Sequence, residues 1–539
     1  MTFIMKRLWI SVLLVLWPSC ALVMANDVYF AQAARGSANG TSCANAIAVT
    51  YFNTSGSWTS STPSGTQIGP GTTVHLCGTI TSALTAQGSG ISGSPITILF
   101  DATTSGNISM PAIPSSGAIV LTSLSYITVD GNNQTGVIQS TNNGSPQAGY
   151  ANQVQSQAIY APYSSNIEVR YLQCVNLYVH TTSADEPSWG APGPICVNFS
   201  GATGPITIDH NIMHDCAWCT YGYVAAGNGA ISVHDNTIYN FDHGLGTGDQ
   251  NAASVYGPVY FYNNNVYNPS TWDTGNNEFH HDGVHLWAYC ADGSSYCSGT
   301  YFNNVYIYNN WFHGNPGTNF NCWIFLEENI HNVWIFNNYL DTSGATLSAG
   351  GGPLYGRGTN VTEYNNTFIG TSGQSPSNQG LGGPGVTNEN NVSCTAPLIS
   401  ISTTDESGNS TTISTLGHNY YMAGNSNAFV WEGNFLSFSQ FSTWQTNSGD
   451  STSAAAATCT VNEPNGTLQS GSPAIGFGTN LYSVCNGQAN PGLGALCSDG
   501  NGNARPTSGA WDAGAYQYLA TNLGTNPPAA PTGLTAVAQ

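Results

Sequence analysis

A recurring pattern of apolar and polar positions organises the chain. One template, in which apolar residues stand at the first, third and eighth positions and asparagine at the sixth, occurs eight times between residues 127 and 368. Its first and third positions are nearly always β-branched or aromatic, whereas the second and fourth vary. This period of two is typical of a strand with one buried face. The copies begin at Ile127, Ile167, Ile206, Ile231, Val259, Val305, Val333 and Val361.

The spacing of these copies predicts a solenoid. Three starts follow the preceding one by 28 residues and one by 25, and the longer intervals, up to 46, are interpreted as the same unit with an inserted loop. A unit of this size cannot bury its own apolar face, so it must stack on its neighbours. We therefore expect an all-β fold, a single-stranded right-handed parallel β-helix with an N-terminal cap and inserted loops.

Asparagine at the sixth position is expected to form a ladder. It is present in seven of the eight copies. In stacked coils these amides would lie about 4.8 Å apart and hydrogen-bond along the stack, which is a structural rather than a catalytic role. The predicted members are Asn132, Asn211, Asn236, Asn264, Asn310, Asn338 and Asn366.

The ends of the chain differ in character from the repeats. Lys6 and Arg7 precede an apolar run that closes with Val-x-Ala at Ala25, the layout of a secretory signal peptide. We expect residues 1–25 to be this leader, 26–120 the cap and first coils, 121–520 the β-helix, and 521–539 a disordered tail that resembles the start of a fibronectin type III linker. The predicted product is secreted and extracellular, and it is not an integral membrane protein.

Composition narrows the class of partner. The 63 glycines and the charged fraction of only 6% exclude a helical protein and fit short strands joined by turns. Loss of Lys6 and Arg7 with the leader changes the formal charge from −21 to −23 and leaves four cations, Arg35, Arg170, Arg357 and Arg505. So acidic a surface would repel nucleic acid and polyanions. We expect a monomer that acts on a neutral polysaccharide, or on an anionic one bridged by calcium.

Thirteen of the 14 cysteines follow the leader, which in an oxidising compartment predicts several disulfides and one free thiol. Proximity favours Cys43 with Cys77, Cys290 with Cys297, and Cys485 with Cys497, although the sequence does not decide connectivity. Cys216 and Cys219 form a C-x-x-C close to His210 and His214. We favour a disulfide there, with a zinc site as the alternative.

Segments at both ends carry a family resemblance. DVYFAQAARGSANGTSCANA and IGPGTTVHLCGTI resemble the cap and first coils of secreted bacterial β-helix proteins of the pectin-lyase-like superfamily, and GSPAIGFG with GNARPTSGAWDAGAYQY is similar to their last coil. The resemblance covers residues 26 to 518 and implies the architecture. It does not imply one chemistry, because the NTD, DD, GHG and RIK motifs of the polygalacturonases are absent.

The fourth template position forms an outward column of charged and then aromatic residues. Tyr262 and Tyr308 lie in it, and Trp334 stands beside it at the second position. Sugars stack on such aromatic strips, so this strip is a candidate glycan groove; the alternative is that loops cover it as a second small core. Arg170, Asp209 and His234, earlier in the column, are interpreted as a salt-bridged ladder.

A second strand in each coil carries acids and histidines. Alignment of Gly244 with Gly283 places Asp242 and His243 of FDHGLGTGD beside His281 and Asp282 of FHHDGVHLW. Extending this register brings Asp249, Glu327 and Arg357 toward the same face. Paired carboxylates are what glycosidic hydrolysis requires, and the separation of coils one or two apart matches retaining or inverting sites.

The leading hypothesis is therefore a secreted glycoside hydrolase with paired carboxylates in a groove along the β-helix. Asp282 and Glu327 are the favoured acid/base pair, with Asp242 or Asp249 as the second carboxylate. The residues expected to bind or orient substrate are His243, His281, His285, Trp287, Arg357, Tyr262, Tyr308 and Trp334.

Two other functions stay open. A polysaccharide lyase would lack a lysine base and would need an arginine, histidine or tyrosine; a non-catalytic glycan-binding or adhesin-like protein would use the ladders structurally. No cofactor is required, although calcium could be held by Asp249, Asp282 or Glu327. A transition-metal site at His280, His281, Asp282 and His285 is disfavoured because strict strand alternation separates these side chains, unless the chain bends at Gly283.

Overall fold

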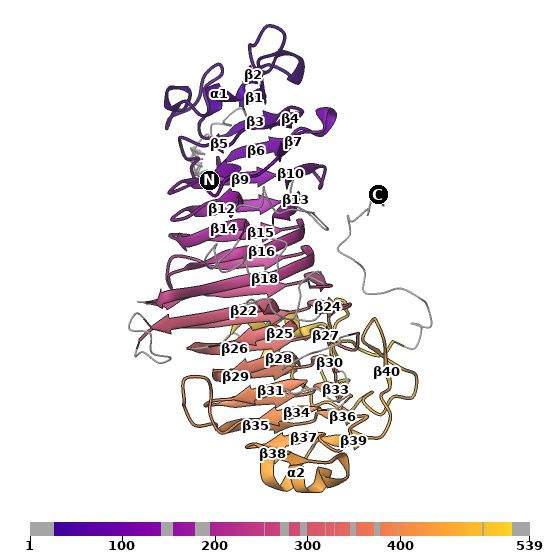
Figure 1. Ribbon diagram of the computed structural model, residues 1–539. Helices are drawn as coiled ribbons and strands as arrows, with labels where there is room; N and C mark the ends of the chain where they lie inside the picture. Colours follow the sequence, from indigo (N-terminus) through magenta and orange to yellow (C-terminus); the bar gives the residue numbers. More distant parts are fainter. Residues whose placement is uncertain are drawn as a thin grey trace, which may run out of the picture.

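In the computed structural model, the chain forms a tall stack of parallel coils (Figure 1). The predicted fold class, an all-β parallel β-helix, is confirmed. The structure describes residues 26–141, 155–177, 194–252, 254–269, 280–290, 299–317, 320–327, 329–344, 352–370, 378–395, 397–487 and 490–519. The predicted leader and tail, residues 1–25 and 521–539, lie outside these ranges.

The first sheet contains the template strands in the order in which the coils stack. Fifteen strands belong to it within the described residues. They are β2 (Ile47–Ala48), β1 (Asn26–Ala31), β3 (Thr72–Leu76), β6 (Ile96–Phe100), β9 (Ser125–Asp130), β12 (Ser165–Arg170), β15 (Ile206–Asp209), β17 (Ile231–His234), β20 (Val259–Tyr262), β23 (Tyr301–Tyr308), β26 (Ile330–Phe336), β29 (Thr359–Tyr364), β32 (Val386–Glu389) and β35 (Ile413–Gly417), with β19 (Val255–Tyr256) beside β23.

The second sheet contains the other strands of the coils, 24 of them in the described part of the chain. They are β4 (Thr79–Ile80), β5 (Leu84–Thr85), β7 (Asn107–Met110), β8 (Ile119–Val120), β10 (Gly136–Ser140), β11 (Gln157–Tyr160), β13 (Leu172–Leu177), β14 (Ile195–Ala202), β16 (Ile212–Val224), β18 (Thr237–Ala252), β21 (Asn265–Tyr267), β22 (His281–Cys290), β24 (Trp311–His313), β25 (Phe320–Leu326), β27 (Tyr339–Asp341), β28 (Gly352–Arg357), β30 (Thr367–Ile369), β31 (Gln379–Gly382), β33 (Val392–Cys394), β34 (Ile399–Ile401), β36 (Tyr420–Met422), β37 (Phe429–Trp431), β38 (Asn434–Leu436) and β39 (Ala454–Ala456).

Short elements complete the described chain. A small antiparallel pair joins β40 (Val461–Asn462) to β41 (Thr467–Leu468). The helices are α1 (Val49–Phe52), α2 (Phe441–Ser448) and α3 (Tyr482–Cys485), with 3-10 turns at Cys43–Asn45, Ser55–Ser57, Ala102–Thr104, Phe438–Gln440 and Pro491–Cys497. None of the described helices is long and apolar enough to cross a bilayer.

The core follows from the template. The third-position side chains Val233, Phe261, Ile307 and Ile335 lie in register on consecutive coils and are fully buried. Because each coil covers the apolar face of the next, one continuous core runs through the stack.

The asparagine ladder is confirmed from Asn211 onward. Each side-chain amide donates to the amide oxygen of the asparagine one coil further at 3.0–3.2 Å. The ladder also includes Asn391 and Asn419, which the template search did not reach. Asn132 is the exception: it has φ +54°, and its amide donates to the carbonyl of Phe100. In the ladder coils the left-handed residue precedes the asparagine instead, as His210 does before Asn211.

The C-terminal segment, which Figure 1 shows in yellow, turns back along the stack. It covers part of the first sheet. Trp311 Nε1 donates to the carbonyl of Pro464, and the Tyr306 hydroxyl donates to Asn490 Oδ1 at 2.8 Å. The buried Arg505 guanidinium donates to Asn337 Oδ1. The segment after the last coil is therefore an integral part of the fold.

Five disulfides lie within the described residues. The pairs predicted by proximity, Cys43–Cys77 and Cys485–Cys497, are confirmed, and Cys216–Cys219 is a disulfide rather than a zinc site. The other two are Cys174–Cys196 and Cys394–Cys459. The predicted Cys290–Cys297 pair is not tested, because Cys297 lies outside the described residues. Cys322 is a free, buried thiol.

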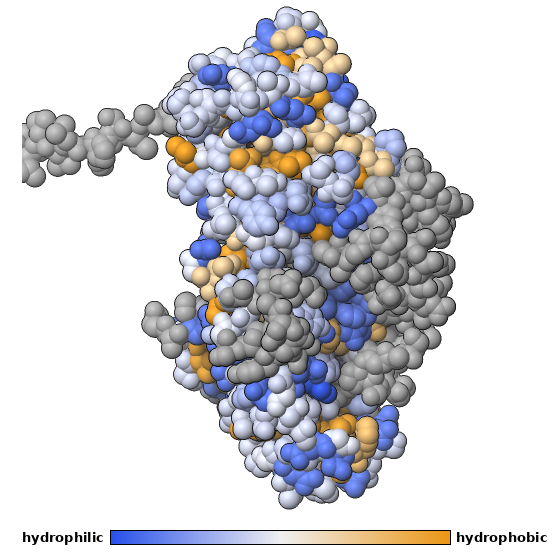
Figure 2. Space-filling view, turned by 60° about the vertical axis from the view of Figure 1, so that its left-hand side comes forward, coloured by the Kyte–Doolittle hydropathy of each residue, from blue (hydrophilic) through white to orange (hydrophobic). Residues whose placement is uncertain are grey.

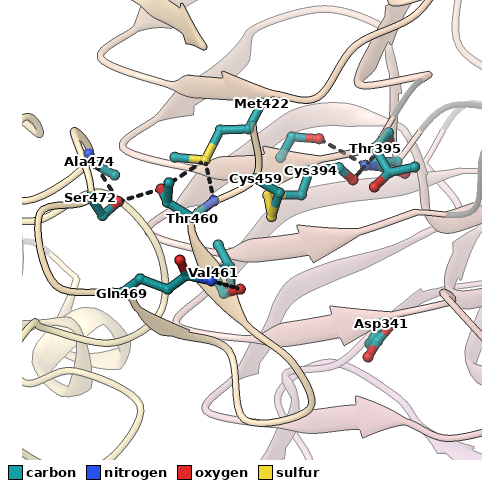
Figure 3. Close-up of a disulfide and its surroundings, with 12 residues drawn as sticks. Asp341, Cys394, Thr395, Met422, Cys459, Thr460, Val461, Gln469, Ser472 and Ala474 are labelled. Atoms are coloured by element: carbon teal, nitrogen blue, oxygen red, sulfur yellow. Dashed lines mark hydrogen bonds between the residues drawn. A yellow bond between two sulfur atoms is a disulfide. The ribbon is translucent and has the colours of Figure 1, made fainter. Parts of the chain in front are cut away.

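The Cys394–Cys459 disulfide fastens β33 to the segment that follows the last coil (Figure 3). Beside it, the backbone N–H and hydroxyl of Thr460 both point to Met422 Sδ at 3.3 Å. The Thr460 hydroxyl also lies 2.7 Å from that of Ser472. These contacts attach the turn-back segment to the end of the solenoid.

On the face shown in Figure 2, apolar patches are small and separated by polar residues. Among the described large apolar side chains, the strongly exposed ones are Ile91, Tyr163 and Phe435, which lie on different parts of the stack.

Candidate functional site

The candidate site lies on the second sheet, where the strands are longest. Strands β16, β18 and β22 pair side by side in the middle of the stack, followed by β25 and β28 (Figure 1). His243 pairs with Asp282 and Leu245 with Val284, so the predicted alignment of Gly244 with Gly283 is confirmed. A Cβ atom on Gly244 would lie 2.5 Å from the Gly283 carbonyl oxygen, and this close approach explains the glycine.

Four side chains from β18 and β22 and from the residue before β22 converge on one point. We name His243, His280, Asp282 and His285 the histidine–aspartate cluster. Asp282 Oδ2 lies 3.0 Å from His280 Nδ1, 3.5 Å from His243 Nε2 and 3.6 Å from His285 Nδ1. One ligand atom from each residue lies within 4.8 Å of all the others. The cluster contains the donor types that a metal ion requires.

The convergence corrects the expectation from strand alternation. Strict alternation would send Asp282 and His285 to opposite faces of β22. Instead, the pairing of β22 with β25 shifts register between His281 and Asp282, and the chain passes through Gly283. The extra residue of that shift, Asn321, lies on β25. On β22 itself Asp282 Oδ2 lies 3.6 Å from His285 Nδ1, so the disfavoured arrangement is the one observed.

The cluster is enclosed by protein. Asp282 is fully buried, His243 and His285 are buried, and only His280 reaches the surface, with 40% of its side chain exposed. Burial lowers the pKa of His243 to about 3 against the opposing effect of Asp282, so its ring is neutral near pH 7. Burial would raise the pKa of Asp282, but His280, His243 and His285 together hold it well below its usual value.

These environments leave Asp282 unsuited to the acid/base role proposed for it. A general acid must be protonated and must reach the leaving oxygen. Asp282 has a lowered pKa and no exposed surface. Its other oxygen, Oδ1, accepts a hydrogen bond from the backbone N–H of Cys322 at 3.0 Å. The carboxylate therefore serves its protein neighbours rather than a polymer.

Asp242 and His281 form a separate buried pair. His281 Nε2 lies 3.4 Å from Asp242 Oδ1 across the two coils, with both side chains almost completely buried. The sequence placed these two residues beside each other correctly, but their burial leaves no access for a polysaccharide.

The backbone of Asp249 pairs with Ala288, and its side chain lies outside the described part of the chain. Leu326 pairs with Leu286, so Glu327, the next residue, lies beside Trp287 rather than beside Ala288, the partner of Asp249. Asp249 and Glu327 are therefore offset by one residue instead of being aligned across the coils.

Aromatic rings pack behind the cluster. The Trp218 ring stacks on His243 with centroids 3.8 Å apart and planes 2° from parallel, and Trp287 packs edge-on against Trp218. A Cβ atom on Gly246 or Gly248 would lie 2.0 Å from the Trp218 or Trp287 ring, so these glycines make room for the indoles. Trp287 is only 5% exposed and therefore packs rather than offering a face to sugar.

Glu327 is the accessible carboxylate beside the cluster. Its side chain is 20% exposed, and its Oε2 lies 3.0 Å from His285 Nε2. The ring of Phe325, two residues earlier, lies against His280, His285 and Tyr355. Glu327 therefore stands at the outer rim of the buried cluster, next to aromatic surface.

A second accessible carboxylate, Glu406, comes from a loop that the sequence did not indicate. Glu406 Oε1 lies 3.0 Å from Arg357 Nη1 and accepts a hydrogen bond from the Tyr355 hydroxyl. The Arg357 guanidinium lies over the Tyr355 ring, 4.5 Å from its centroid. Since Arg357 follows Gly356, the partner of Leu326, it stands one coil beyond Glu327. Glu327, Tyr355, Arg357 and Glu406, with Phe325, form what we name the rim.

The predicted aromatic strip lies on the other sheet. Tyr262 and Tyr308 stack with centroids 4.8 Å apart, and Trp334 stacks on Tyr306. The C-terminal segment packs against Tyr308 and Trp334 through a group of buried side chains that includes Leu481, Leu493 and Trp511. The alternative of a second small core is therefore the observed arrangement, and the structure does not bring these residues to the cluster.

In the charged part of the column, Arg170 forms salt bridges with Asp130 and Glu168 rather than with Asp209. Asp209 is instead hydrogen-bonded to His210.

Comparison with known proteins finds similar solved structures but no matching family. No family model and no curated protein matches the chain. Among solved structures, XylC in complex with xylose is 11% identical over 92% of this chain and 98% of its own, with a TM-score of 0.45. Pectate lyase Pel9A is 16% identical over 92% and 96%, with a TM-score of 0.33. DFA-IIIase from Arthrobacter chlorophenolicus A6 in complex with GF2 is 12% identical over 71% and 90%, with a TM-score of 0.37. The parallel β-helix architecture of the chain is shown by the pairing of its own strands.

Proposed function

We propose that the protein is a secreted, polysaccharide-active enzyme and that its reaction is glycoside hydrolysis at the rim. The observation that carries this proposal is the partly exposed carboxylate of Glu327, which lies 3.0 Å from His285. The five disulfides support export to an oxidising compartment. The chain's strongly negative charge and few cations favour a neutral polymer.

The rim supplies the groups that hydrolysis needs. Two carboxylates flank the bond in most glycosidases, one as proton donor and the other as nucleophile or base. Glu406, paired with the Arg357 cation, suits the carboxylate that attacks the sugar or activates water. Glu327, whose Oε2 faces His285 Nε2, supplies the second carboxylate. The rings of Phe325 and Tyr355 pack against each other at the rim and offer apolar faces to sugar.

A lyase is the second candidate, because Arg357 and Tyr355 stand together at the rim. Arginine can neutralise a uronate carboxylate, and a phenol can exchange the proton in β-elimination. This reaction would call for an anionic substrate, which the overall charge disfavours unless calcium bridges it.

The test is a panel of neutral and uronate polysaccharides incubated with the full chain, with and without calcium. New reducing ends without an ultraviolet-absorbing product support hydrolysis, whereas an unsaturated uronate supports elimination. Retained binding without any product would refute both and support a glycan-binding protein. We expect Glu327→Gln and Glu406→Gln each to lower kcat by at least about 100-fold. The exposed Glu432→Gln is the matched control and keeps full activity. Full activity of Glu327→Gln would exclude the rim as the active site.

A further inference from the structure

We propose that the histidine–aspartate cluster binds one divalent transition-metal ion, with zinc as the ion that fits its donors and spacing. The four ligand atoms are His243 Nε2, His280 Nδ1, His285 Nδ1 and Asp282 Oδ2. This site is independent of the polysaccharide reaction, because its evidence comes only from the cluster and the side chains around it.

The spacing of the ligand atoms matches a tetrahedral ion. Zinc binds histidine nitrogen and carboxylate oxygen at about 2.0–2.1 Å, which places the corners of a tetrahedron about 3.3 Å apart. The three distances from Asp282 Oδ2 are 3.0, 3.5 and 3.6 Å. All four ligand atoms lie within 4.8 Å of one another, so an ion fits between them once the histidine side chains move inward.

The same four atoms lack hydrogen-bond partners. His243 Nε2, His280 Nδ1, His285 Nδ1 and Asp282 Oδ2 are each buried at the atom and make no hydrogen bond, although they lie close to one another. A buried polar atom without a partner is costly, and buried charges are normally paired or coordinate metals. A shared metal ion satisfies all four atoms at once.

Three histidines elsewhere in the described chain make ordinary hydrogen bonds with an adjacent aspartate. His210, His214 and His234 each place Nδ1 within 2.6–2.8 Å of an adjacent aspartate in hydrogen-bond geometry, and each makes a simple pair. In the cluster, by contrast, three histidine nitrogens and one aspartate oxygen come together without hydrogen-bonding to one another. A histidine next to an aspartate does not by itself produce this geometry in the fold.

Outer contacts hold the ligands in the required orientation. His285 Nε2 faces Glu327 Oε2 at 3.0 Å, an arrangement that puts the ring proton on Nε2 and leaves the Nδ1 lone pair for the ion. Asp282 Oδ1 accepts the N–H of Cys322, and His243 is clamped by the parallel Trp218 ring. Metal-binding histidines characteristically have such carboxylate partners.

The donor set selects the class of metal. Three imidazoles and one carboxylate suit zinc and other late transition metals, whereas calcium takes six or more oxygens. The Asp282 oxygen would therefore serve a transition metal rather than the calcium considered from sequence. With all four positions filled by protein, the ion would be structural: it would join β18 to β22 and, through His285, fix Glu327 at the rim.

The test measures metal on the full chain without any polysaccharide. The purified protein is stripped with a chelator, titrated with zinc chloride by calorimetry, and analysed for bound metal after dialysis. We expect one ion per chain. His280→Ala, at the exposed edge, and Asp282→Asn, which keeps the side-chain shape, should each weaken binding by more than about 100-fold.

His234→Ala is the matched control, since it removes a histidine paired with an aspartate outside the cluster. It should bind zinc as the wild type does. Failure of the stripped wild-type chain to take up stoichiometric zinc, or wild-type affinity in both His280→Ala and Asp282→Asn, would overturn the proposal. Because no substrate is present, this outcome is separate from a failure to find polysaccharide activity.

Discussion

A single buried carboxyl group should make stability fall as pH rises. Glu363 occupies the inward third position of its template copy, where the other seven template copies carry apolar residues, and it is completely buried. Its Oε2 accepts from Asn388 Nδ2 at 2.7 Å, whereas Oε1 has no hydrogen-bond partner. Burial raises the pKa of Glu363 from 4.5 to about 8, against the smaller opposing effect of the Asn388 hydrogen bond.

The sign and size follow from proton linkage. Between pH 4.5 and 8 the unfolded chain releases the Glu363 proton while the folded chain retains it. The unfolded state then binds fewer protons, so the free energy of unfolding decreases with pH across this window and levels off above it. The full contribution is about 5 kcal/mol, at about 1.4 kcal/mol for each unit of pKa. The stabilisation is complete below pH 4.5 and is lost once pH passes about 8.

Urea denaturation at about pH 5 and about pH 8, followed by circular dichroism, measures this effect. Glu363→Gln keeps the acceptor for Asn388 and removes the titrating proton, so its urea midpoint should depend less on pH and exceed that of the wild type at the higher pH. Glu432→Gln, at an exposed position, should retain the pH dependence of the wild type. Equal pH dependence in Glu363→Gln and the wild type would refute the reasoning.

Two further substitutions test the packing of the solenoid. Asn310→Ala removes the acceptor for the backbone N–H and side-chain amide of Asn264. It should lower the free energy of unfolding, measured by urea denaturation, by about 1–3 kcal/mol. No loss of stability would contradict a structural role for the ladder. Gly246→Ala places a methyl group 2.0 Å from the Trp218 ring and should lower the free energy of unfolding by about 1–3 kcal/mol. Gly56→Ala, with open space around it, is the control and should leave Tm nearly unchanged. Equal Tm values for the two variants would contradict the close approach.

Much of the architecture could be predicted from local sequence. The period of two and the regular return of asparagine specify a strand, a turn and a register with each neighbour, and those contacts repeat from coil to coil. The alignment of Gly244 with Gly283 followed from the same regularity and is observed. Glu363 stands out in the sequence as the polar exception at a buried position, although its environment becomes clear only when the adjacent coils are in place.

The candidate site was only partly predictable, because it depends on departures from regularity. The chain at the start of β22 departs from strict alternation and gathers His280, Asp282 and His285 with His243. Glu406 reaches Arg357 from a loop 49 residues further along the chain. No local sequence pattern predicts either the convergence of the cluster or the contact between Glu406 and Arg357.

The sequence by itself determined the repeat, the inward residues of each strand, the ladder and the pairing of neighbouring coils, since these follow from contacts that every coil makes in the same way. Only the tertiary structure decided which polar groups became exposed or buried. The C-terminal segment covers Tyr308 and Trp334, and burial removes Asp282 from solvent and draws it to three histidines. The physical reason is that exposure and the convergence of donor atoms depend on segments far apart in sequence and on local irregularities of a strand, neither of which a repeating pattern encodes.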